Sequence, residues 1–483
     1  MTSEQIKRLL DVCIALSAER DREALLFRIL DTAMDLTVCD AGTLYLLEED
    51  GLHFCRMETR SFGIRQGGPA TPITLPPVPL KSSHVCARAV LEGHLINVPD
   101  VKNDDRFDFS GAARYDAMTG YDTRSMLVFP LTSDKGRIIG VLQLINAMTP
   151  EGKLTAFPAE IEPLVRALAS QAAISLTNMQ YADKVQGLLD SLVRTLSAAI
   201  DERTPYNANH SRNMARYGEA FLDWLERTGN DWKFDQDKRR EFLMSVWLHD
   251  VGKLIVPLEV MDKENRLGSA LERVRQRFST MALLDRIARL EGRITDEEAD
   301  QRAAARDEGL ALIEKVNNAG FLPDDTLAAI NALAERTYTD EQGEERPWLT
   351  KSEHIALSVR KGTLTAAERQ IMENHVVVTG HLLEQISFPE EYSHVAEWAS
   401  AHHELLNGRG YPDHRTAETL PREVRLLSIL DVFDALTAKD RPYKKPMPIE
   451  RALSILHSMV DEGSLDGEIL ALFEQSQAWE VSA

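Results

Sequence analysis

The pattern of apolar and polar positions changes near residue 160. Before that point, short apolar runs alternate with polar turns, and the segments RSMLVFPL and RIIGVLQLINA flank the polar residues 133–136 as in a hairpin. Helical spacing precedes and follows these runs. The sequence therefore predicts an N-terminal α+β domain built on an antiparallel sheet.

From about residue 161 the spacing is helical, and one apolar stripe recurs at four- and three-residue steps: Val185, Leu189, Leu192 and Leu196. Such a stripe fits a dimer seam between two copies of the chain. It fits equally a helix that packs on its own domain. We favour a homodimer through this linking helix, because a parallel pair of helices could carry a signal between two domains.

After residue 201 the pattern predicts an almost entirely helical region with no convincing strand. Residues 264–360 form a distinct block within it. Apolar positions every three or four residues predict a long helix over residues 271–290 and a second through Leu310, and Gly320 precedes the start of a third. We interpret this block as a helical insertion that packs on the surrounding domain or pairs with a second subunit.

Composition narrows the class of protein. A chain of 483 residues is too long to fold around one ordinary hydrophobic core, so more than one domain is expected. A composition of 43% hydrophobic and 27% charged residues is typical of a globular protein. The formal net charge of -21 argues against broad binding to nucleic acid or an anionic membrane. No apolar run reaches the ~20 residues of a membrane helix, no secretory signal is evident, and the four cysteines lack paired spacing. We therefore expect a cytoplasmic protein.

The candidate chemistry gathers in the helical half, where ten of the thirteen histidines lie. FLMSVWLHDVGK brings His249 and Asp250 to the end of an apolar helix, and AHHELLNGRGYP places His402 and His403 before a glycine-rich turn. Imidazole and carboxylate ligands suit iron, manganese, zinc or nickel, and the absence of cysteine here disfavours a structural zinc site.

Five segments, in order, resemble the HD-GYP branch of the HD phosphohydrolases: YNANHSRNMARYG, LHDVGKLIVP, KGTLTAAERQIMENHVVVTG, AHHELLNGRGYP and LSILDVFDALTAKDRPYK. The resemblance spans roughly residues 188–473 apart from the insertion. It implies an all-α HD-type domain in two parts, residues 204–263 and 361–483, separated by the insertion at 264–360. Residues 179–203 would form the linking helix and the first helix of this domain.

The resemblance implies two divalent transition metals, iron or manganese with nickel or zinc as alternatives, held by seven residues: His210, His249, Asp250, His375, His402, His403 and Asp431. Asp250 would be shared by the two cations, whose expected chemistry is activation of water for in-line attack on phosphorus. Lys253 would assist the leaving oxygen. Tyr206 stands where members with a third metal carry a carboxylate, which favours two metals.

The same resemblance implies a cyclic dinucleotide substrate. Arg441 and Lys444 would meet its phosphates or a guanine edge, and Asp434 and Tyr411 would shape that region. The implied reaction hydrolyses cyclic di-GMP to pGpG or GMP. The chain departs from the family pattern in three ways: Asn407 stands where aspartate is commoner, one extra residue precedes RPY, and the insertion is large. These departures leave two alternatives to the implied function. These are a weak or inactive receptor or protein-interaction platform, and an HD phosphohydrolase of another nucleotide, including cyclic GMP-AMP.

The N-terminal half resembles a GAF domain of the cyclic nucleotide phosphodiesterase type, over residues 5–178. NDDRFDFSGAARYDAMTGYDTRSMLVFPL, GVLQLINA and AFPAEIE carry the resemblance, although Ala147 and Ile161 depart from the subtype's signature. It implies a sensor domain that binds a cyclic nucleotide, with a degenerate dimerisation domain as the alternative. The candidate pocket residues are Thr119, Tyr121, Thr123, Arg124 and Asn146.

Overall fold

The structure is a computed structural model that describes residues 3–68, 70–203, 209–438 and 446–480. The chain divides into two compact units, Met1–Leu188 and Leu189–Ala483. Each unit is described by itself below. No helix in these ranges combines the length and the apolar character that crossing a bilayer requires.

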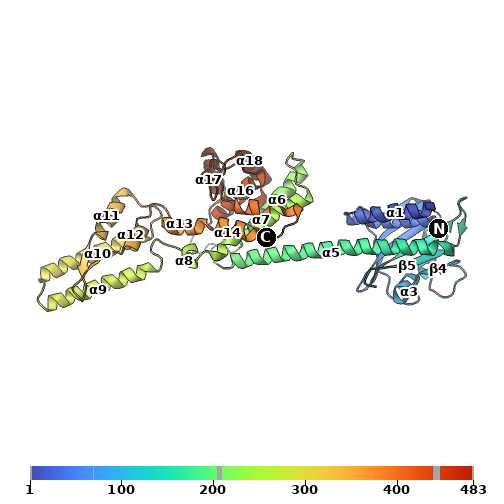
Figure 1. The fold of residues 1–483 in the computed structure, drawn as a ribbon, viewed down its shortest axis with the longest axis horizontal. Helices are drawn as coiled ribbons and strands as arrows, with labels where there is room; N and C mark the ends of the chain where they lie inside the picture. Colours follow the sequence, from blue (N-terminus) through green and yellow to red (C-terminus); the bar gives the residue numbers. More distant parts are fainter. Residues whose placement is uncertain (1–2, 69, 204–208, 439–445, 481–483) are drawn as a thin grey trace. The chain divides into compact units, whose positions relative to one another are not determined.

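The first unit is an antiparallel sheet with helices on both faces (Figure 1). Its strands follow the order β3-β2-β1-β6-β5-β4, with β7 beside β6. Their bounds are β1 Cys39–Glu48, β2 Gly51–Thr59, β3 Ile64–Gln66, β4 Ile96–Val98, β5 Met126–Thr132, β6 Ile138–Met148 and β7 Leu154–Thr155. The predicted hairpin is β5 with β6, in which Phe129 pairs with Leu142. The α+β prediction is confirmed.

Alternation along β6 sends neighbouring side chains into two different cores. Leu142 and Leu144 face the core formed with α2 and the start of α5, whereas Val141 faces the core that contains Val85 and Ala89 of α3. The helices of this unit are α1 Ser3–Ala18, α2 Arg22–Thr37, α3 Val85–Glu92, α4 Ser110–Thr119 and α5 Glu162–Asp201. The sheet is therefore covered on both faces.

Helix α5 is one continuous helix of 40 residues that begins in the first unit and ends in the second. Its first turns supply Val165, Leu168 and Ala172 to the core of the first unit. Further along, the stripe of Val185, Leu189, Leu192 and Leu196 is 38% to 57% exposed. Within a single chain, this stripe is therefore not a packing face.

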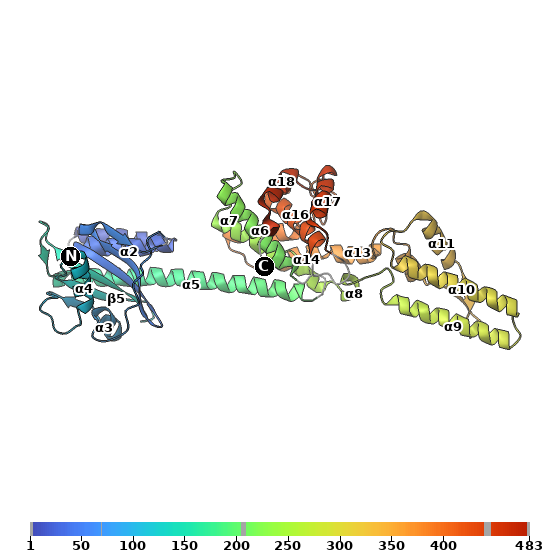
Figure 2. The same cartoon turned by 180° about the vertical axis from the view of Figure 1, so that it is seen from behind.

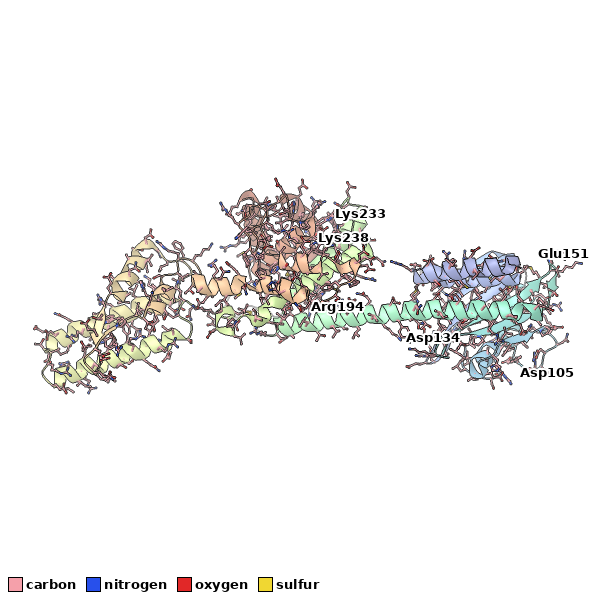
Figure 3. The ribbon with its side chains drawn as sticks, viewed as in Figure 1. Asp105, Asp134, Glu151, Arg194, Lys233 and Lys238 are labelled. Carbon is pink, nitrogen blue, oxygen red and sulfur yellow. The ribbon has the colours of Figure 1, made fainter. Side chains whose placement is uncertain are left out.

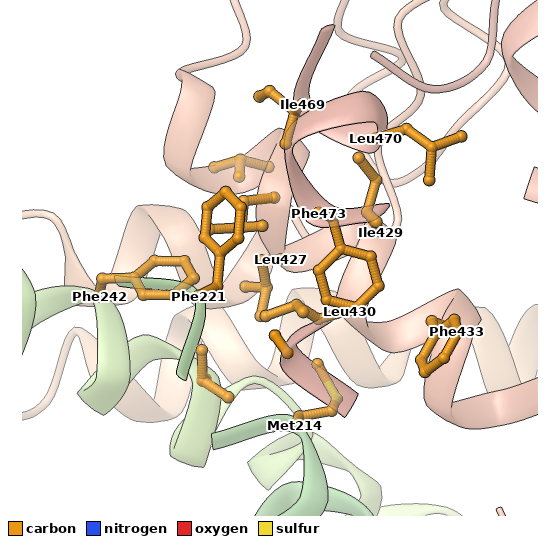
Figure 4. Packing of buried hydrophobic residues seen from close by; sticks show 14 of the residues in the cluster. Met214, Phe221, Phe242, Leu427, Ile429, Leu430, Phe433, Ile469, Leu470 and Phe473 are labelled. Atoms are coloured by element: carbon orange, nitrogen blue, oxygen red, sulfur yellow. The ribbon is translucent and has the colours of Figure 1, made fainter. Parts of the chain in front are cut away.

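The second unit is built mainly from helices around one large core (Figure 4). Phe221 of α6 and Phe242 of α7 pack with Leu430 and Phe433 of α16 and Phe473 of α18. The helices are α6 His210–Thr228, α7 Gln236–Leu248, α8 Leu258–Met261, α13 Ala366–Glu373, α14 His375–Leu383, α15 Val395–Ser400, α16 Arg422–Thr437, α17 Ile449–Asp461 and α18 Gly467–Ser476, with η3 Val251–Ile255 after α7.

The predicted insertion has a core of its own, formed by residues such as Val274, Phe278, Ile313 and Trp348. Helices α9 Ala270–Leu290 and α10 Asp296–Asn317 lie side by side in both views (Figures 1 and 2), followed by α11 Asp324–Ala334 and α12 Lys351–Leu357. The buried guanidinium of Arg266 joins the two ends of the block by donating to carbonyls of residues 316, 319 and 359.

The expectation that no strand follows residue 201 is wrong at one place. β8 Thr337–Thr339 pairs antiparallel with β9 Glu345–Pro347. Each strand has three residues, and the second contains a proline. Alternation over three positions is too short to distinguish a strand from a turn in the sequence.

Candidate metal centre

Helix α7 delivers the His-Asp pair to the interior of the second unit. The Asp235 side chain caps its first turn by accepting from the Lys238 N–H, and Phe242 and Val246 bury its apolar face in the core. The helix ends at Leu248, so His249 and Asp250 follow at once and are almost fully buried. The apolar run before them is what makes the buried position possible.

Three histidine rings are oriented by the same kind of hydrogen bond to the backbone. The Nδ1 atoms of His249, His375 and His402 each lie 2.6–2.7 Å from the carbonyl oxygen three residues earlier. A carbonyl can only accept, so each Nδ1 carries a hydrogen, and in the neutral ring the lone pair is on Nε2. Three imidazoles are thus oriented as ligands before any metal binds.

The seven predicted ligands converge around Asp250. His249 Nε2 lies 3.3 Å from Asp250 Oδ2, and His375 Nε2 lies 3.3 Å from Oδ1 of the same carboxylate. His402 Nε2 is 3.8 Å from Oδ1. The donor atoms form three overlapping groups, each within 4.8 Å: His210 with His249 and Asp431, His249 with Asp250 and His402, and His375 with His402 and His403. These groups are candidate metal-binding sets.

The inward-facing atoms fit a cation. Asp250 Oδ1, His375 Nε2 and His402 Nε2 are buried and have no hydrogen-bond partner among the described residues. Each buried polar atom left in this state costs about 1–3 kcal/mol. In the neutral rings, the Nε2 lone pairs of His375 and His402 both face Asp250 Oδ1. These lone pairs and the carboxylate oxygen repel one another, and a cation bound between them would attract all three.

Burial and neighbouring charges set the protonation of the centre. Burial, with the charges of His403 and His249, holds the pKa of His402 well below its usual range, and burial lowers the pKa of His403 to about 4. Burial opposes ionisation of Asp250, but Lys253 and His249 outweigh it and hold its pKa well below the usual range. For His210, Asp431 and Asp434 outweigh burial and raise the pKa to about 10. His402, His403 and Asp250 are therefore ready to bind a metal, whereas His210 holds a proton.

Known protein families match both halves of the chain. The GAF domain family matches residues 21–176, and the HD domain family matches residues 352–469. The chain combines a GAF domain with an HD domain. The HD match contains four of the seven candidate ligands, His375, His402, His403 and Asp431.

Several curated proteins are similar to part of the chain. It is 36% identical over 110 residues to 3'3'-cGAMP-specific phosphodiesterase 3 of Vibrio cholerae, covering 22% of this chain and 23% of that protein. It is 35% identical over 102 residues to the cyclic di-GMP phosphodiesterase response regulator RpfG of Xanthomonas campestris, covering 21% and 26%. A cyclic di-GMP phosphodiesterase of Thermotoga maritima is 33% identical over 101 residues, covering 21% and 27%. The chain spans about a quarter of the length of these relatives.

A threonine that the sequence did not single out supports the centre of the HD domain. Thr379 of α14 is fully buried; its Oγ1 accepts from the Gly252 N–H at 2.9 Å and lies 3.1 Å from the His249 carbonyl oxygen, to which it donates. A Cβ on Gly252 would lie 1.9 Å from the His375 carbonyl oxygen. Only glycine allows this approach, so the turn after Asp250 is fastened to the helix that carries His375.

The Gly-Tyr-Pro loop lies on the second histidine pair. Glu404 accepts from the Asp413 and Arg415 N–H groups at 2.6 and 2.8 Å. The Tyr411 N–H donates to the His403 carbonyl at 3.2 Å, and the two rings are 4.9 Å apart. Glu404, given no role by the sequence, therefore holds the loop over His403.

Asn407, which stands in this loop where aspartate is commoner in the family, has hydrogen-bond partners in the structure. Its amide nitrogen donates to the Glu462 carbonyl and to the Ser464 hydroxyl at 3.2 and 2.9 Å. The Asn407 side chain therefore joins the loop to residues 462 and 464.

The remaining predicted residues of the HD domain divide into three cases. Lys253 Nζ lies 2.5 Å from Asp250 Oδ2, and the charge of Asp250 outweighs burial and raises the pKa of Lys253. Asp434 is 1% exposed, and its Oδ2 accepts from His210 Nδ1 at 2.7 Å. In this position its carboxylate orients the ring of the candidate ligand His210. Arg441, Lys444 and Tyr206 lie outside the described residues.

The GAF domain contains a cavity of about 660 Å³ between the sheet, α3 and α4. Tyr121 and Thr123 line it, but Thr119, Arg124 and Asn146 do not. Asn146 has a φ of 60°; its side chain accepts from the Arg124 and Ser125 N–H groups and donates to the Asp122 carbonyl. The structure thus brings two of the five predicted pocket residues to the cavity and gives Asn146 a backbone-supporting position.

Proposed function

We propose that this protein is a cytoplasmic, metal-dependent phosphodiesterase that hydrolyses cyclic di-GMP to pGpG or GMP under the control of its GAF domain. The observation that carries the proposal is the convergence of five histidines and two aspartates with unpartnered atoms facing inward. The names of the relatives support a cyclic dinucleotide as the substrate. Four free cysteines fit a reducing compartment.

Two divalent cations would be held by the overlapping ligand groups around Asp250. Iron or manganese suits imidazole and carboxylate ligands, with nickel or zinc as alternatives. When bound, such a pair supplies Lewis-acid activation of water and neutralises charge that develops on the phosphate.

The side chains of this protein would divide the remaining work. Lys253 holds a proton at Nζ beside Asp250 and would donate it to the leaving oxygen. Tyr411, whose ring lies next to that of His403, would limit how the substrate enters. We also assign Arg441 and Lys444 to the substrate phosphates or a guanine edge, where a guanidinium offers a planar pair of donors.

The test is turnover by protein purified without oxygen and loaded with iron or manganese. Chromatography should show cyclic di-GMP converted to pGpG or GMP, and His402→Ala should remove this activity. Cyclic GMP-AMP belongs in the same assay, because two relatives carry the name 3'3'-cGAMP-specific phosphodiesterase. Fully metallated protein that turns over neither compound contradicts the proposal and favours a receptor.

We propose further that the chain forms a homodimer through α5. The exposed stripe of Val185, Leu189, Leu192 and Leu196 supports this, because it has the spacing of a coiled-coil seam and stays 38% to 57% exposed among the described residues. Leu192→Glu should convert the dimer to a monomer in light scattering, whereas Leu283→Glu, an exposed leucine on α9, should not.

A cyclic mononucleotide is our proposal for the GAF cavity. Aromatic side chains at its wall, including Tyr45, Phe54 and Tyr115, support a stacked base, and the volume fits a small ligand. Cyclic AMP or cyclic GMP should raise the melting temperature, and Tyr121→Ala should reduce the shift. No shift with either compound would favour a degenerate dimerisation domain.

A further inference from the structure

A second cavity, of about 470 Å³, lies in the second unit between the end of α5, α6 and α7. None of the seven candidate metal ligands lines it. Four arginines from three helices do: Arg194, Arg212, Arg216 and Arg240. Figure 3 labels Arg194 on α5. The half-buried ring of Trp247 on α7 forms part of the wall, and the Arg194 guanidinium lies 5.8 Å from its centre.

Four acidic residues line the same cavity: Asp190, Asp201, Glu202 and Glu219. Asp201 accepts from both the N–H and the hydroxyl of Ser211, at 3.1 and 3.0 Å. Glu219 lies 3.9 Å from Arg239, outside the cavity. Asp190 also has an interaction partner.

Three of the arginines lack such a partner. Within the described residues, Arg194, Arg212 and Arg240 form no ion pair with a carboxylate; Arg212 only donates to the Asn209 side chain, at 3.1 Å. The three guanidiniums come from α5, α6 and α7 and line one cavity. Their donors remain available to a ligand, within a lining that holds four arginines and four acidic residues.

We propose that this arginine groove, defined by Arg194, Arg212, Arg240 and Trp247, binds a phosphate-bearing nucleotide as an effector. Guanidinium groups present planar donors that match phosphate oxygens. The indole ring and the Arg194 plane offer faces on which a base can stack. The volume lies in the range of small-molecule sites, roughly 300–1,000 Å³.

The walls of the groove connect to the metal centre. Asp201 at the end of α5 holds Ser211, the residue after His210. Just beyond α5, the Arg203 guanidinium donates to the carbonyls of residues 253, 254 and 256, directly after the His-Asp pair. An effector that joins α5 to α6 and α7 would stabilise both connections and raise the rate of hydrolysis. This regulatory step rests on the proposed function, but the binding does not.

Calorimetry on the full chain with GMP, AMP and inorganic pyrophosphate tests the binding. We expect the double variant Arg212→Glu/Arg240→Glu to weaken nucleotide binding at least tenfold. Arg227→Glu, on α6 but outside the groove, is the matched control and should bind as the wild type does. All three positions are exposed, so the fold should be retained; circular dichroism checks this, and the single Arg240→Gln gives a milder test.

A second comparison isolates the nucleobase. Trp247→Ala should weaken GMP or AMP binding by several fold and leave pyrophosphate binding unchanged, whereas Trp247→Phe should bind nearly as the wild type does. His402→Ala should leave binding to the groove intact, which separates it from product binding at the metal centre. Absence of binding by all three probes at millimolar concentration would overturn the proposal, as would equal affinity of the double variant. A loss of hydrolysis with intact, arginine-dependent binding would instead contradict the proposed function alone.

Discussion

The candidate metal centre of the HD domain and the cavity region of the GAF domain use polar side chains in opposite ways. At the metal centre, one nitrogen of His375 or His402 is tied to a helix carbonyl and the other is left without a partner. In the GAF domain, Asn146, which does not line the cavity, gives both ends of its amide to the backbone, and the hydroxyl of Thr123, which does, donates to Asp116 at 2.8 Å. A polar side chain whose atoms are all engaged supports the fold, whereas one with a fixed and a free end presents itself to a ligand.

The largest effect is expected from removing the carboxylate that the ligand groups share. Asp250→Ala should lose most bound metal and bring turnover below detection, because both histidine groups lose their common neighbour. Elemental analysis and a turnover assay measure the two losses. Asp461→Ala, an exposed aspartate on α17, is the control. Full metal retention by the Asp250 variant would show that the free ends at this centre are not ligands.

A smaller effect is expected from the buried threonine behind the centre. Thr379→Val keeps the shape but removes the hydroxyl that joins Gly252 to the His249 carbonyl, so metal affinity should fall about 10–100-fold. Thr379→Ser keeps the hydroxyl and should retain most of the affinity. The readout is a competitive metal titration. Equal affinity of the valine and serine variants would mean that Thr379 only fills space.

Proton release should make metal uptake depend on pH. In the metal-free centre the pKa of His210 is raised to about 10, because Asp431 and Asp434 outweigh burial, whereas the ordinary value is about 6.5. A raised pKa stabilises the metal-free fold fully below about pH 6.5, and this contribution is lost as the pH rises through about 10. Metal must displace the proton, so apparent affinity should rise about tenfold per pH unit in this interval.

Two measurements check this dependence. Metal titrations between pH 7 and 9 should show the rising affinity, and the melting temperature of metal-free protein should fall over the same interval. A flat affinity profile would mean that His210 is not a ligand.

The smallest change in ligand affinity is expected from a substitution of Asn146 in the GAF domain. Asn146→Ala removes the hydrogen bonds that hold residues 122–125, so the domain should lose about 1–3 kcal/mol of stability. Because Asn146 does not line the cavity, the affinity for cyclic GMP should change less than about twofold. Chemical denaturation and calorimetry measure the two quantities. A large loss of affinity without loss of stability would reverse the comparison between the two regions.

Local patterns explain which parts of this molecule could be predicted from the sequence. The β5–β6 hairpin follows from alternation over neighbouring residues, and the seven candidate ligands lie in short motifs whose residue types already indicate metal binding. Thr379 could not be found in this way, because its partners lie 127 and 130 residues away in the chain. Asn146 matched a signature, but the sequence could not show that its amide is used by residues 122–125.

The insertion leaves the HD domain and returns to it at neighbouring points. Arg266 near its start bonds to the carbonyl of Val359 near its end, and a backbone hydrogen bond joins Leu322 to Arg360. A loop between close ends costs little to shorten or replace. We therefore expect that a short glycine-containing turn in place of residues 267–358 would leave a folded second unit that keeps all seven candidate metal ligands.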